Sequence, residues 1–230
     1  MLTLDEFAQM IDHAVLGPSQ TDTDLEEGVR VARKYRVKCF CPNPYQLARA
    51  RELLQGSDVQ LCCPIGFPQG VTLPEVKQFE AETALKLGAR ELDMTINVGA
   101  LKARRYDLVE QDIAGVVEVA RRFGASVKTI IETCLLTDDE KVAACQIAER
   151  AGALFIKTST GCQAGGATVE DVRLLRAAVG PNVVIKASGQ VSDIEKALAL
   201  YEAGARRFGT SSTVSILEGL RRKIEEQSRG

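Results

Sequence analysis

The chain has 230 residues and a formal net charge of −2. This balance argues against a basic nucleic-acid-binding surface, and no apolar run reaches the roughly 18 residues of a membrane-spanning helix. The first residues carry early acids in place of a basic stretch, so no secretory signal is expected. Neither nucleic acid nor a membrane is therefore expected as a partner.

The cysteine pattern argues against metal and disulfide sites. Seven cysteines accompany a single histidine, His13, and none of them forms the C-x-x-C pair of a zinc site. Several lie in apolar runs, where cysteine behaves as a small hydrophobic residue. We expect no metal, and a reduced, cytoplasmic protein.

Apolar runs alternate with longer amphipathic stretches along the whole sequence. The apolar runs predict strands over about 10–16, 37–41, 59–63, 91–98, 127–132, 154–157, 183–186 and 207–209. The stretches around them predict a short N-terminal helix over 3–10 and further helices over about 22–35, 45–54, 73–87, 101–123, 138–151, 168–179, 192–202 and 213–226. Thr137 and Glu140 form a capping-box pattern before one of these helices.

Eight strand–helix units in succession predict a parallel sheet. Their number and the chain length fit an α/β fold of the (β/α)8 TIM-barrel type, as a single domain over residues 1–230. A doubly wound open sheet is the alternative, but the first strand is not followed by the G-x-G-x-x-G turn of that fold.

Two lysines end neighbouring strands in the same way. Lys157 closes an apolar run and precedes Thr-Ser-Thr-Gly, and Lys186 closes another and precedes Ala-Ser-Gly. Burial disfavours the charged form of a lysine, and a second cation nearby disfavours it further, so a free amine becomes available for Schiff-base chemistry. The alternative is that each lysine simply extends from a strand end into solvent.

Further polar residues lie at or near strand ends, where barrel enzymes carry their chemistry. Asp93 is the most informative, because a carboxylate inside an apolar strand is costly unless it is paired. An inward-facing Asp93 beside Lys186 could relay protons; the alternative is a surface-facing residue. The other members of this set are Asp12, Cys41, Glu132, Ser211 and Ser212.

The sequence resembles the 2-deoxyribose-5-phosphate aldolase family over nearly its whole length. The motifs that carry the resemblance are Ile-Asp-His at 11–13, Cys-Pro-Asn-Pro at 41–44, Gly-Phe-Pro-Gln-Gly at 66–70, Glu-Leu-Asp-Met at 91–94, Ile-Ile-Glu-Thr at 130–133, Phe-Ile-Lys-Thr-Ser-Thr-Gly at 155–161, Gly-Gly-Ala-Thr-Val-Glu-Asp at 165–171, Lys-Ala-Ser-Gly at 186–189 and Gly-Thr-Ser-Ser at 209–212.

This resemblance implies a class I aldolase that needs no cofactor and acts on a sugar phosphate and aldehydes. It implies that Lys157 forms the Schiff base, that Lys186 tunes it and that Asp93 takes part in proton transfer. It places substrate contacts at Asp12, Cys41, Thr158, Gly161, Gly189, Gly209, Ser211 and Ser212. For Cys41 a packing role is as well supported as a chemical one. Family members are often dimers or tetramers, so a homodimer or homotetramer is expected.

The sequence departs from the family pattern at the phosphate-binding end. The family usually has a second glycine and then an arginine after Lys-Ala-Ser-Gly, where this chain has Gln190 and Ser192. We therefore expect weaker phosphate capture, or an unphosphorylated substrate. A different Schiff-base lyase and a non-catalytic phosphosugar-binding barrel are the alternatives to the phosphate-specific enzyme. A flavin or nicotinamide barrel has only fold analogy in its favour.

Overall fold

The eight apolar runs form the strands of one closed parallel barrel in the computed structural model, which describes residues 2–227. The strands are β1 (Ile11–Val15), β2 (Cys39–Pro42), β3 (Gln60–Ile65), β4 (Glu91–Thr95), β5 (Ser126–Ile130), β6 (Phe155–Lys157), β7 (Val184–Ser188) and β8 (Ala205–Thr210). Each strand pairs with the next along the chain, and β8 pairs back with β1, where Ile11 lies opposite Phe208. The expected (β/α)8 barrel is confirmed.

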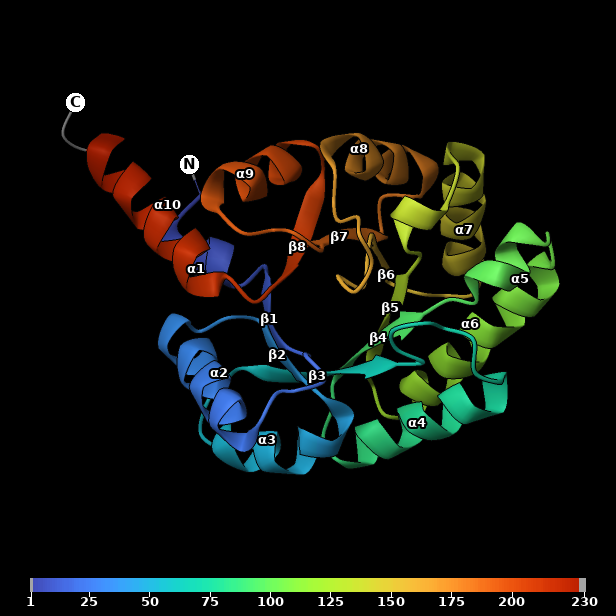
Figure 1. The fold of residues 1–230 in the computed structure, drawn as a ribbon, viewed down its shortest axis with the longest axis horizontal. Coiled ribbons are helices and arrows are strands. Elements are labelled where there is room, and N and C mark those ends of the chain that lie inside the picture. The colour runs from blue at the N-terminus through green and yellow to red at the C-terminus, as the bar shows by residue number, and fades with distance from the viewer. Residues whose placement is uncertain (1, 228–230) are drawn as a thin grey trace.

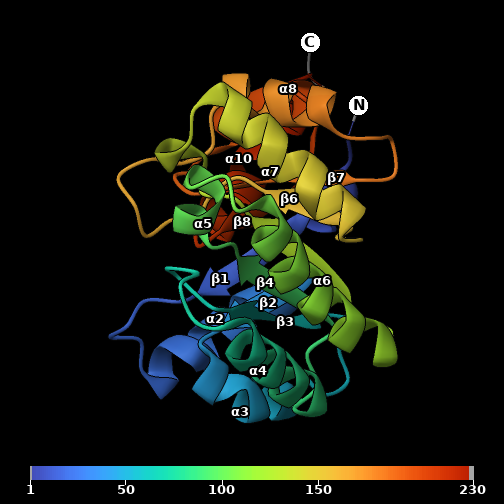
Figure 2. The same cartoon turned by 90° about the vertical axis from the view of Figure 1, so that its right-hand side faces the viewer.

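Helices surround the strands on the outside (Figures 1 and 2). They are α1 (Leu4–Ala8), α2 (Asp22–Tyr35), α3 (Leu47–Leu53), α4 (Pro74–Lys86), α5 (Val98–Lys102), α6 (Tyr106–Arg122), α7 (Asp138–Arg150), α8 (Val169–Ala178), α9 (Ile194–Glu202) and α10 (Thr213–Gln227), with short 3-10 turns at Pro44–Gln46 and Thr133–Leu135. Within the described residues, no helix is both long and apolar enough to cross a membrane.

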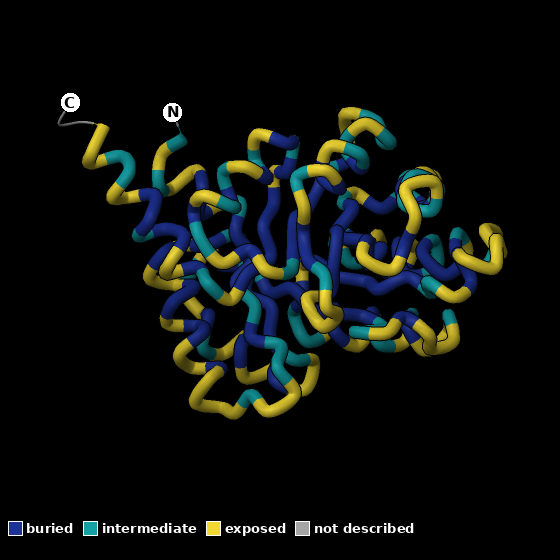
Figure 3. The backbone as a smooth tube through the Cα atoms, turned by 45° about the horizontal axis from the view of Figure 1, so that its top comes forward, coloured by how far each residue is buried: buried dark blue, intermediate teal, exposed yellow. Residues whose placement is uncertain are grey.

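Helix α2 shows how the sequence produces this arrangement. A capping box between Thr21 and Asp24 begins the helix. Leu25, Val29 and Ala32 recur at the spacing of one helical face and are buried, while the opposite face is charged and exposed. The other helices follow the same rule, so burial is concentrated on the strands and the inner faces of the helices (Figure 3).

Two predictions for the segment from the fourth strand to the helix after it are wrong. The fourth strand was expected to run to residue 98 but ends at Thr95, because the Asn97 side chain accepts a hydrogen bond from the Ala100 amide and caps α5. The single helix expected over 101–123 is divided into α5 and α6. The break is at Arg104, whose φ of 57° is left-handed and cannot continue a helix.

Candidate active site

The pairing of β6 with β7 places the two lysines side by side, although β7 continues two residues beyond Lys186, its predicted end. Lys157 lies opposite Lys186 in the register, and both side chains are buried. The Nζ atoms of both lysines contact the same oxygen, Oδ2 of Asp93, each at 2.7 Å. The two nitrogens are therefore no more than twice that distance apart. Asp93 points into the barrel, as the paired interpretation of this residue requires.

A second carboxylate, Asp12 on β1, also binds Lys186. Its Oδ2 lies 2.5 Å from the Lys186 Nζ. Burial opposes charge on Lys186, but Asp12 and Asp93 outweigh it and raise the pKa of this lysine above its usual value. Burial likewise opposes charge on Asp93, and the three lysines around that carboxylate nevertheless hold its pKa well below the usual value. The site is therefore a set of ion pairs, with Lys186 firmly protonated.

Further charged side chains, which the sequence did not predict as part of the site, pair with these carboxylates and with Glu91. Lys128 on β5 contacts Asp93 Oδ1 at 2.8 Å, Glu91 at 2.7 Å and Asp12 at 3.3 Å. Arg207 on β8 contacts Asp12 at 2.7 Å and Glu91 at 2.9 Å. A signal was present, because charged residues within strands that helices cover must face the interior of the barrel and be paired.

The charges in this interior do not balance. The cations are Lys128, Lys157, Lys186 and Arg207, and the carboxylates are Asp12, Glu91 and Asp93. If all seven groups are ionised, the cluster carries one surplus positive charge. Among the described residues, Lys157 contacts a single carboxylate, whereas Lys186 and Arg207 each contact two and Lys128 contacts three.

Thiols fill the space between these charges. Cys39 donates to Glu91 and Cys62 donates to Asp93, each with a donor–acceptor distance of 3.1 Å. Burial raises the pKa of both thiols well above the usual value, so both remain protonated donors. Cys41 is buried next to them and borders the cavity above.

Among the described residues, two groups of side chains have donor atoms close enough together to surround a metal ion. Cys41, Cys62 and Asp93 form one, and Asp12, Cys39 and Glu91 form the other, with donor atoms within 4.8 Å of one another. The carboxylates of both groups already hold ammonium and guanidinium groups at 2.5–3.3 Å. A dication would be repelled by these neighbours, so the donor sets do not fit a metal ion.

A cavity of about 750 Å³ opens above the lysines at the carboxyl ends of the strands. Ten of the eleven site residues expected from the sequence line it: Asp12, Cys41, Asp93, Lys157, Gly161, Lys186, Gly189, Gly209, Ser211 and Ser212. Thr158 is the exception. Its fully buried hydroxyl donates to the Ser188 carbonyl and accepts from the Ser188 amide, so it joins β6 to β7 rather than facing the cavity.

Known proteins resemble this chain over nearly its full length. A family model described as DeoC/LacD family aldolase matches residues 7–218. The chain belongs to this family. It is therefore an aldolase, a lyase that makes and breaks carbon–carbon bonds.

Individual members of the DeoC/LacD family agree with this assignment. A protein named deoxyribose-phosphate aldolase from Streptococcus sanguinis is 53% identical over 209 residues, which cover 91% of this chain and 94% of the relative. One of the same name from Thermococcus gammatolerans is 52% identical over 218 residues, covering 94% and 97%. The tetrameric deoxyribose phosphate aldolase structure from Aeropyrum pernix superimposes with a TM-score of 0.89 at 34% identity, covering 95% of this chain and 92% of that one.

The departure from the DeoC family pattern lies in the loop after β7. Gln190 adopts a left-handed conformation with φ of 57°, which a glycine accommodates without strain. Its side chain donates to the Ala164 carbonyl at 3.0 Å, and so bridges to the loop after β6. Ser192 borders the cavity and donates to Asp193 at 2.9 Å. Residue 190 thus keeps the left-handed backbone conformation that suits the family's glycine, but it carries a glutamine side chain.

Glu132 holds the loop that follows the Schiff-base candidate of this DeoC-family chain. Its carboxylate accepts hydrogen bonds from the Thr160 amide and from the Thr160 hydroxyl, and that hydroxyl accepts from the Cys162 amide. Glu132 is buried and left-handed at φ of 55°. The sequence placed Glu132 near a strand end without a role, and the structure shows that it orders residues 160–162 at the cavity wall.

Proposed function

We propose that this aldolase cleaves 2-deoxy-D-ribose 5-phosphate to acetaldehyde and D-glyceraldehyde 3-phosphate, and catalyses the reverse addition, through a Schiff base on Lys157. The observation that carries the proposal is the convergence of Lys157 and Lys186 on one oxygen of Asp93 at the floor of the cavity. The identity of the substrate is inferred from the relatives named deoxyribose-phosphate aldolase, which are 53% and 52% identical to this chain.

The pattern of ion pairs supports Lys157 as the nucleophile. Among the described residues, Lys157 contacts one carboxylate, that of Asp93. The other cations of the cluster are held more tightly, because Lys186 and Arg207 each contact two carboxylates and Lys128 contacts three. Lys186 and Lys128 are held protonated by their carboxylates, which raise the pKa of each above its usual value against the effect of burial. Lys157 also borders the cavity directly, so its amine can reach a substrate.

The cleavage follows from an amine at this position. The Lys157 amine adds to C1 of the open-chain sugar, and the carbinolamine loses water to give an iminium ion. A base removes the proton of the C3 hydroxyl, the C2–C3 bond breaks, and its electron pair moves into the iminium to form an enamine. D-glyceraldehyde 3-phosphate leaves with the new aldehyde at the former C3.

The remaining steps return the enzyme to its starting state. The enamine takes a proton at its terminal carbon, and water hydrolyses the resulting imine to acetaldehyde and free Lys157. We assign both proton transfers to a water held by Asp93 and Lys186, since these groups contact each other at 2.7 Å beside Lys157. General acid–base steps of this kind contribute about 10²- to 10⁴-fold each.

Imine trapping tests this proposal. Borohydride reduction in the presence of acetaldehyde should leave an ethyl group on Lys157, because the iminium carbon is reduced in place. Peptide mass spectrometry locates the modification, and Lys157→Arg, which keeps the charge but offers no free amine, is the matched control. An unmodified Lys157, or an ethyl group on Lys186 instead, would contradict the assignment.

We also propose that two copies of this chain associate through an apolar surface formed by α4 and the segments that precede α3 and α4. Tyr45, Val71, Leu73 and Phe79 are each more than 60% exposed, and Val76 is 48% exposed. A groove of about 300 Å³ on the same surface has Pro44, Leu47 and Leu87 in its wall. Projecting rings beside a hollow allow a two-fold contact in which each copy fills the other's groove, and the Aeropyrum pernix relative is described as tetrameric.

A single domain and a reducing, cytoplasmic location are proposed with this function. The first and last strands of the chain close the same barrel, so residues from both ends contribute to one core. Cys39 and Cys62 act as thiol donors to carboxylates, and they can do so only while they are reduced.

A further inference from the structure

The side of the cavity above β3 carries a phenyl ring, that of Phe67, and among the described residues that line the cavity it is the only one. Phe67 follows β3, which pairs in parallel with β4 so that Pro64 lies opposite Asp93. Because parallel strands of a barrel end at the same rim, the segment after β3 lies next to the end of the strand that carries Asp93. The ring is therefore on the side of the cavity where Asp93 contacts the Lys157 amine.

The polar tail of the sugar phosphate is expected on the opposite side. In the closed ring of eight strands β3 lies four positions from β7, so the loops that follow them face each other across the mouth. The loops after β7 and β8 and the start of α10 contribute Gly189, Ser211, Ser212 and Val214 to the cavity wall. Backbone amides at a helix N-terminus and hydroxyl groups suit the anionic end of the substrate. The two-carbon donor, which is bound at Lys157, is thus left on the side of Phe67.

The segment that carries Phe67 is fixed at both ends by hydrogen bonds. The Gly66 amide donates to the Glu80 carboxylate at 2.7 Å, and the Gly70 amide donates to the Gly66 carbonyl at 2.7 Å. A Cβ atom at Gly70 would come within 2.0 Å of the Ile96 oxygen, so the segment packs directly against the chain that follows β4. Residues 66–70 therefore form a closed turn held between α4 and the end of β4.

A buried ion pair lies against this turn. Lys77 on α4 is fully buried, and its Nζ contacts Asp112 Oδ2 on α6 at 2.5 Å and donates to the Thr95 carbonyl at 3.1 Å. A Cβ atom at Gly66 would lie 2.8 Å from the Lys77 Cε, so the turn packs on the lysine stem. Separating a buried charge pair is costly, which makes this support rigid. The backbone of Phe67 is therefore held in place, and a fixed wall can select ligands by size.

We propose that Phe67 limits the size of the donor aldehyde, so that acetaldehyde is favoured over aldehydes with a longer chain. The inference rests on the Schiff base at Lys157 proposed above. The methyl group of the bound donor is apolar, and the phenyl ring offers it an apolar contact that the charged groups around Lys157 do not. A longer donor must displace the ring, and one methylene in a fitted apolar pocket changes the discrimination between substrates by about 10- to 200-fold.

Competition between two aldehydes tests the donor end of the site without an acceptor. The wild-type enzyme is incubated with equal concentrations of acetaldehyde and propanal and with cyanoborohydride, and the ethyl and propyl groups on the Lys157 peptide are compared by mass spectrometry. The exposed Lys34 gives the ratio that the intrinsic reactivity of the two aldehydes sets. We expect the ratio of ethyl to propyl at Lys157 to exceed that at Lys34 by about tenfold or more, and Phe67→Ala to remove most of this excess.

A variant on the opposite wall provides the matched control. Val214→Ala shortens an apolar side chain at the start of α10 and should keep the wild-type ratio at Lys157. Phe67 is partly exposed, so its replacement should leave the fold intact. Equal ratios at Lys157 and Lys34 in the wild type, an unchanged ratio in Phe67→Ala, or the same change in both variants would overturn the inference. If Lys34 is alkylated while Lys157 of the wild type carries neither group, the Schiff-base function itself is wrong.

Discussion

At the scale of single residues, the role of each buried lysine depends on the charged groups that it contacts. Three lysines contact Asp93, and they differ mainly in how many other carboxylates each one holds. The sequence could single out Lys157 and Lys186, because each closes an apolar run that a glycine follows within four residues. It could not single out Lys128, whose only signal is its position inside a covered strand. Contacts between residues on opposite sides of a barrel depend on closure and register, which no local pattern contains.

His13 provides a pH-dependent prediction at this scale. Burial lowers its pKa from the ordinary 6.5 to about 4, only partly offset by Glu27, so between those values the unfolded chain binds a proton that the folded chain does not. Its stabilising contribution is complete above about pH 6.5 and is lost as the pH falls toward 4. The difference amounts to about 2–3 kcal/mol.

Urea unfolding at pH 7 and at pH 4 measures this effect. The wild type should lose more unfolding free energy between the two pH values than His13→Gln does, because glutamine can keep a hydrogen bond to Thr213 but does not titrate. In the wild type, Nδ1 of His13 lies 2.9 Å from the Thr213 hydroxyl. Equal losses in the two proteins would show that His13 does not couple to folding.

At the scale of helices and strands, the sequence was informative wherever a boundary has local chemistry. The capping boxes at Thr21 and Thr137 begin helices where the pattern predicts them. The division between α5 and α6 was missed, because the break at Arg104 has neither glycine nor proline to announce it. The eighth strand was expected over three residues and spans six, since charged Arg206 and Arg207 obscure its apolar alternation.

Helix α7 allows the capping box to be tested. Thr137 accepts from the Glu140 amide, and the Glu140 carboxylate accepts from the Thr137 amide at 2.8 Å. Thr137→Ala removes one side of this exchange and should lower the free energy of unfolding by about 1 kcal/mol. Thr137→Ser keeps the hydroxyl and should stay close to wild type in chemical denaturation. An alanine variant as stable as the serine variant would contradict the capping role.

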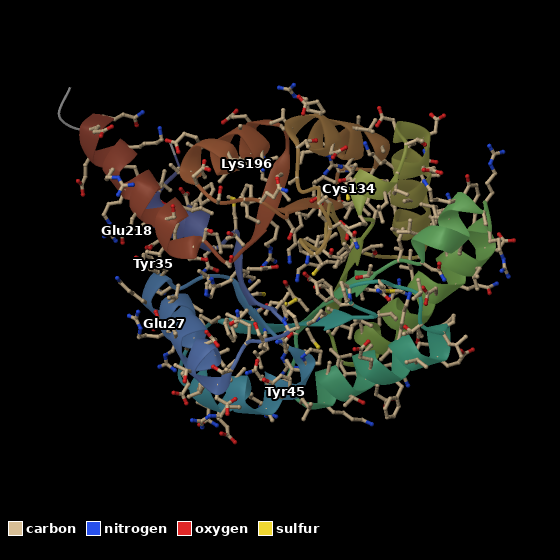
Figure 4. All side chains as sticks on the ribbon, viewed as in Figure 1. Glu27, Tyr35, Tyr45, Cys134, Lys196 and Glu218 are labelled. Carbon is tan, nitrogen blue, oxygen red and sulfur yellow. The ribbon has the colours of Figure 1, made fainter. Side chains whose placement is uncertain are left out.

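At the scale of the whole molecule, the four most exposed large apolar side chains of the described residues belong to one surface, the patch that contains Tyr45, Val71, Leu73 and Phe79. Tyr45 lies beside α3 at the edge of the molecule, away from the cavity residue Glu27 and from the Tyr35–Glu218 contact between α2 and α10 (Figure 4). The hydroxyl of Tyr45 nevertheless donates to the Gln20 carbonyl at 3.1 Å, and Gln20 lines the cavity. Association through the patch would therefore bring the second copy close to one side of the cavity mouth.

Light scattering coupled to size-exclusion chromatography tests the association. Phe79→Lys places a charge at the most exposed ring of the patch and should shift the wild-type oligomer toward monomer. Tyr106→Lys, at an exposed aromatic on α6 outside the patch, is the control and should keep the wild-type mass. A wild-type protein that is already monomeric at micromolar concentration would contradict the proposed interface.

The closure of β8 onto β1 also has a consequence for how the protein is made. Asp12 is translated early and Arg207 nearly last, yet the two form an ion pair at 2.7 Å across the seam where the ring closes. In a nascent chain whose residue 207 has not yet emerged from the ribosome, Asp12 lacks this partner. The barrel is then still open, and the unpaired edge of β1 and that of the last strand formed are exposed to water. The reactive centre can therefore be assembled only at the end of synthesis, even though its first carboxylate lies within the first dozen residues.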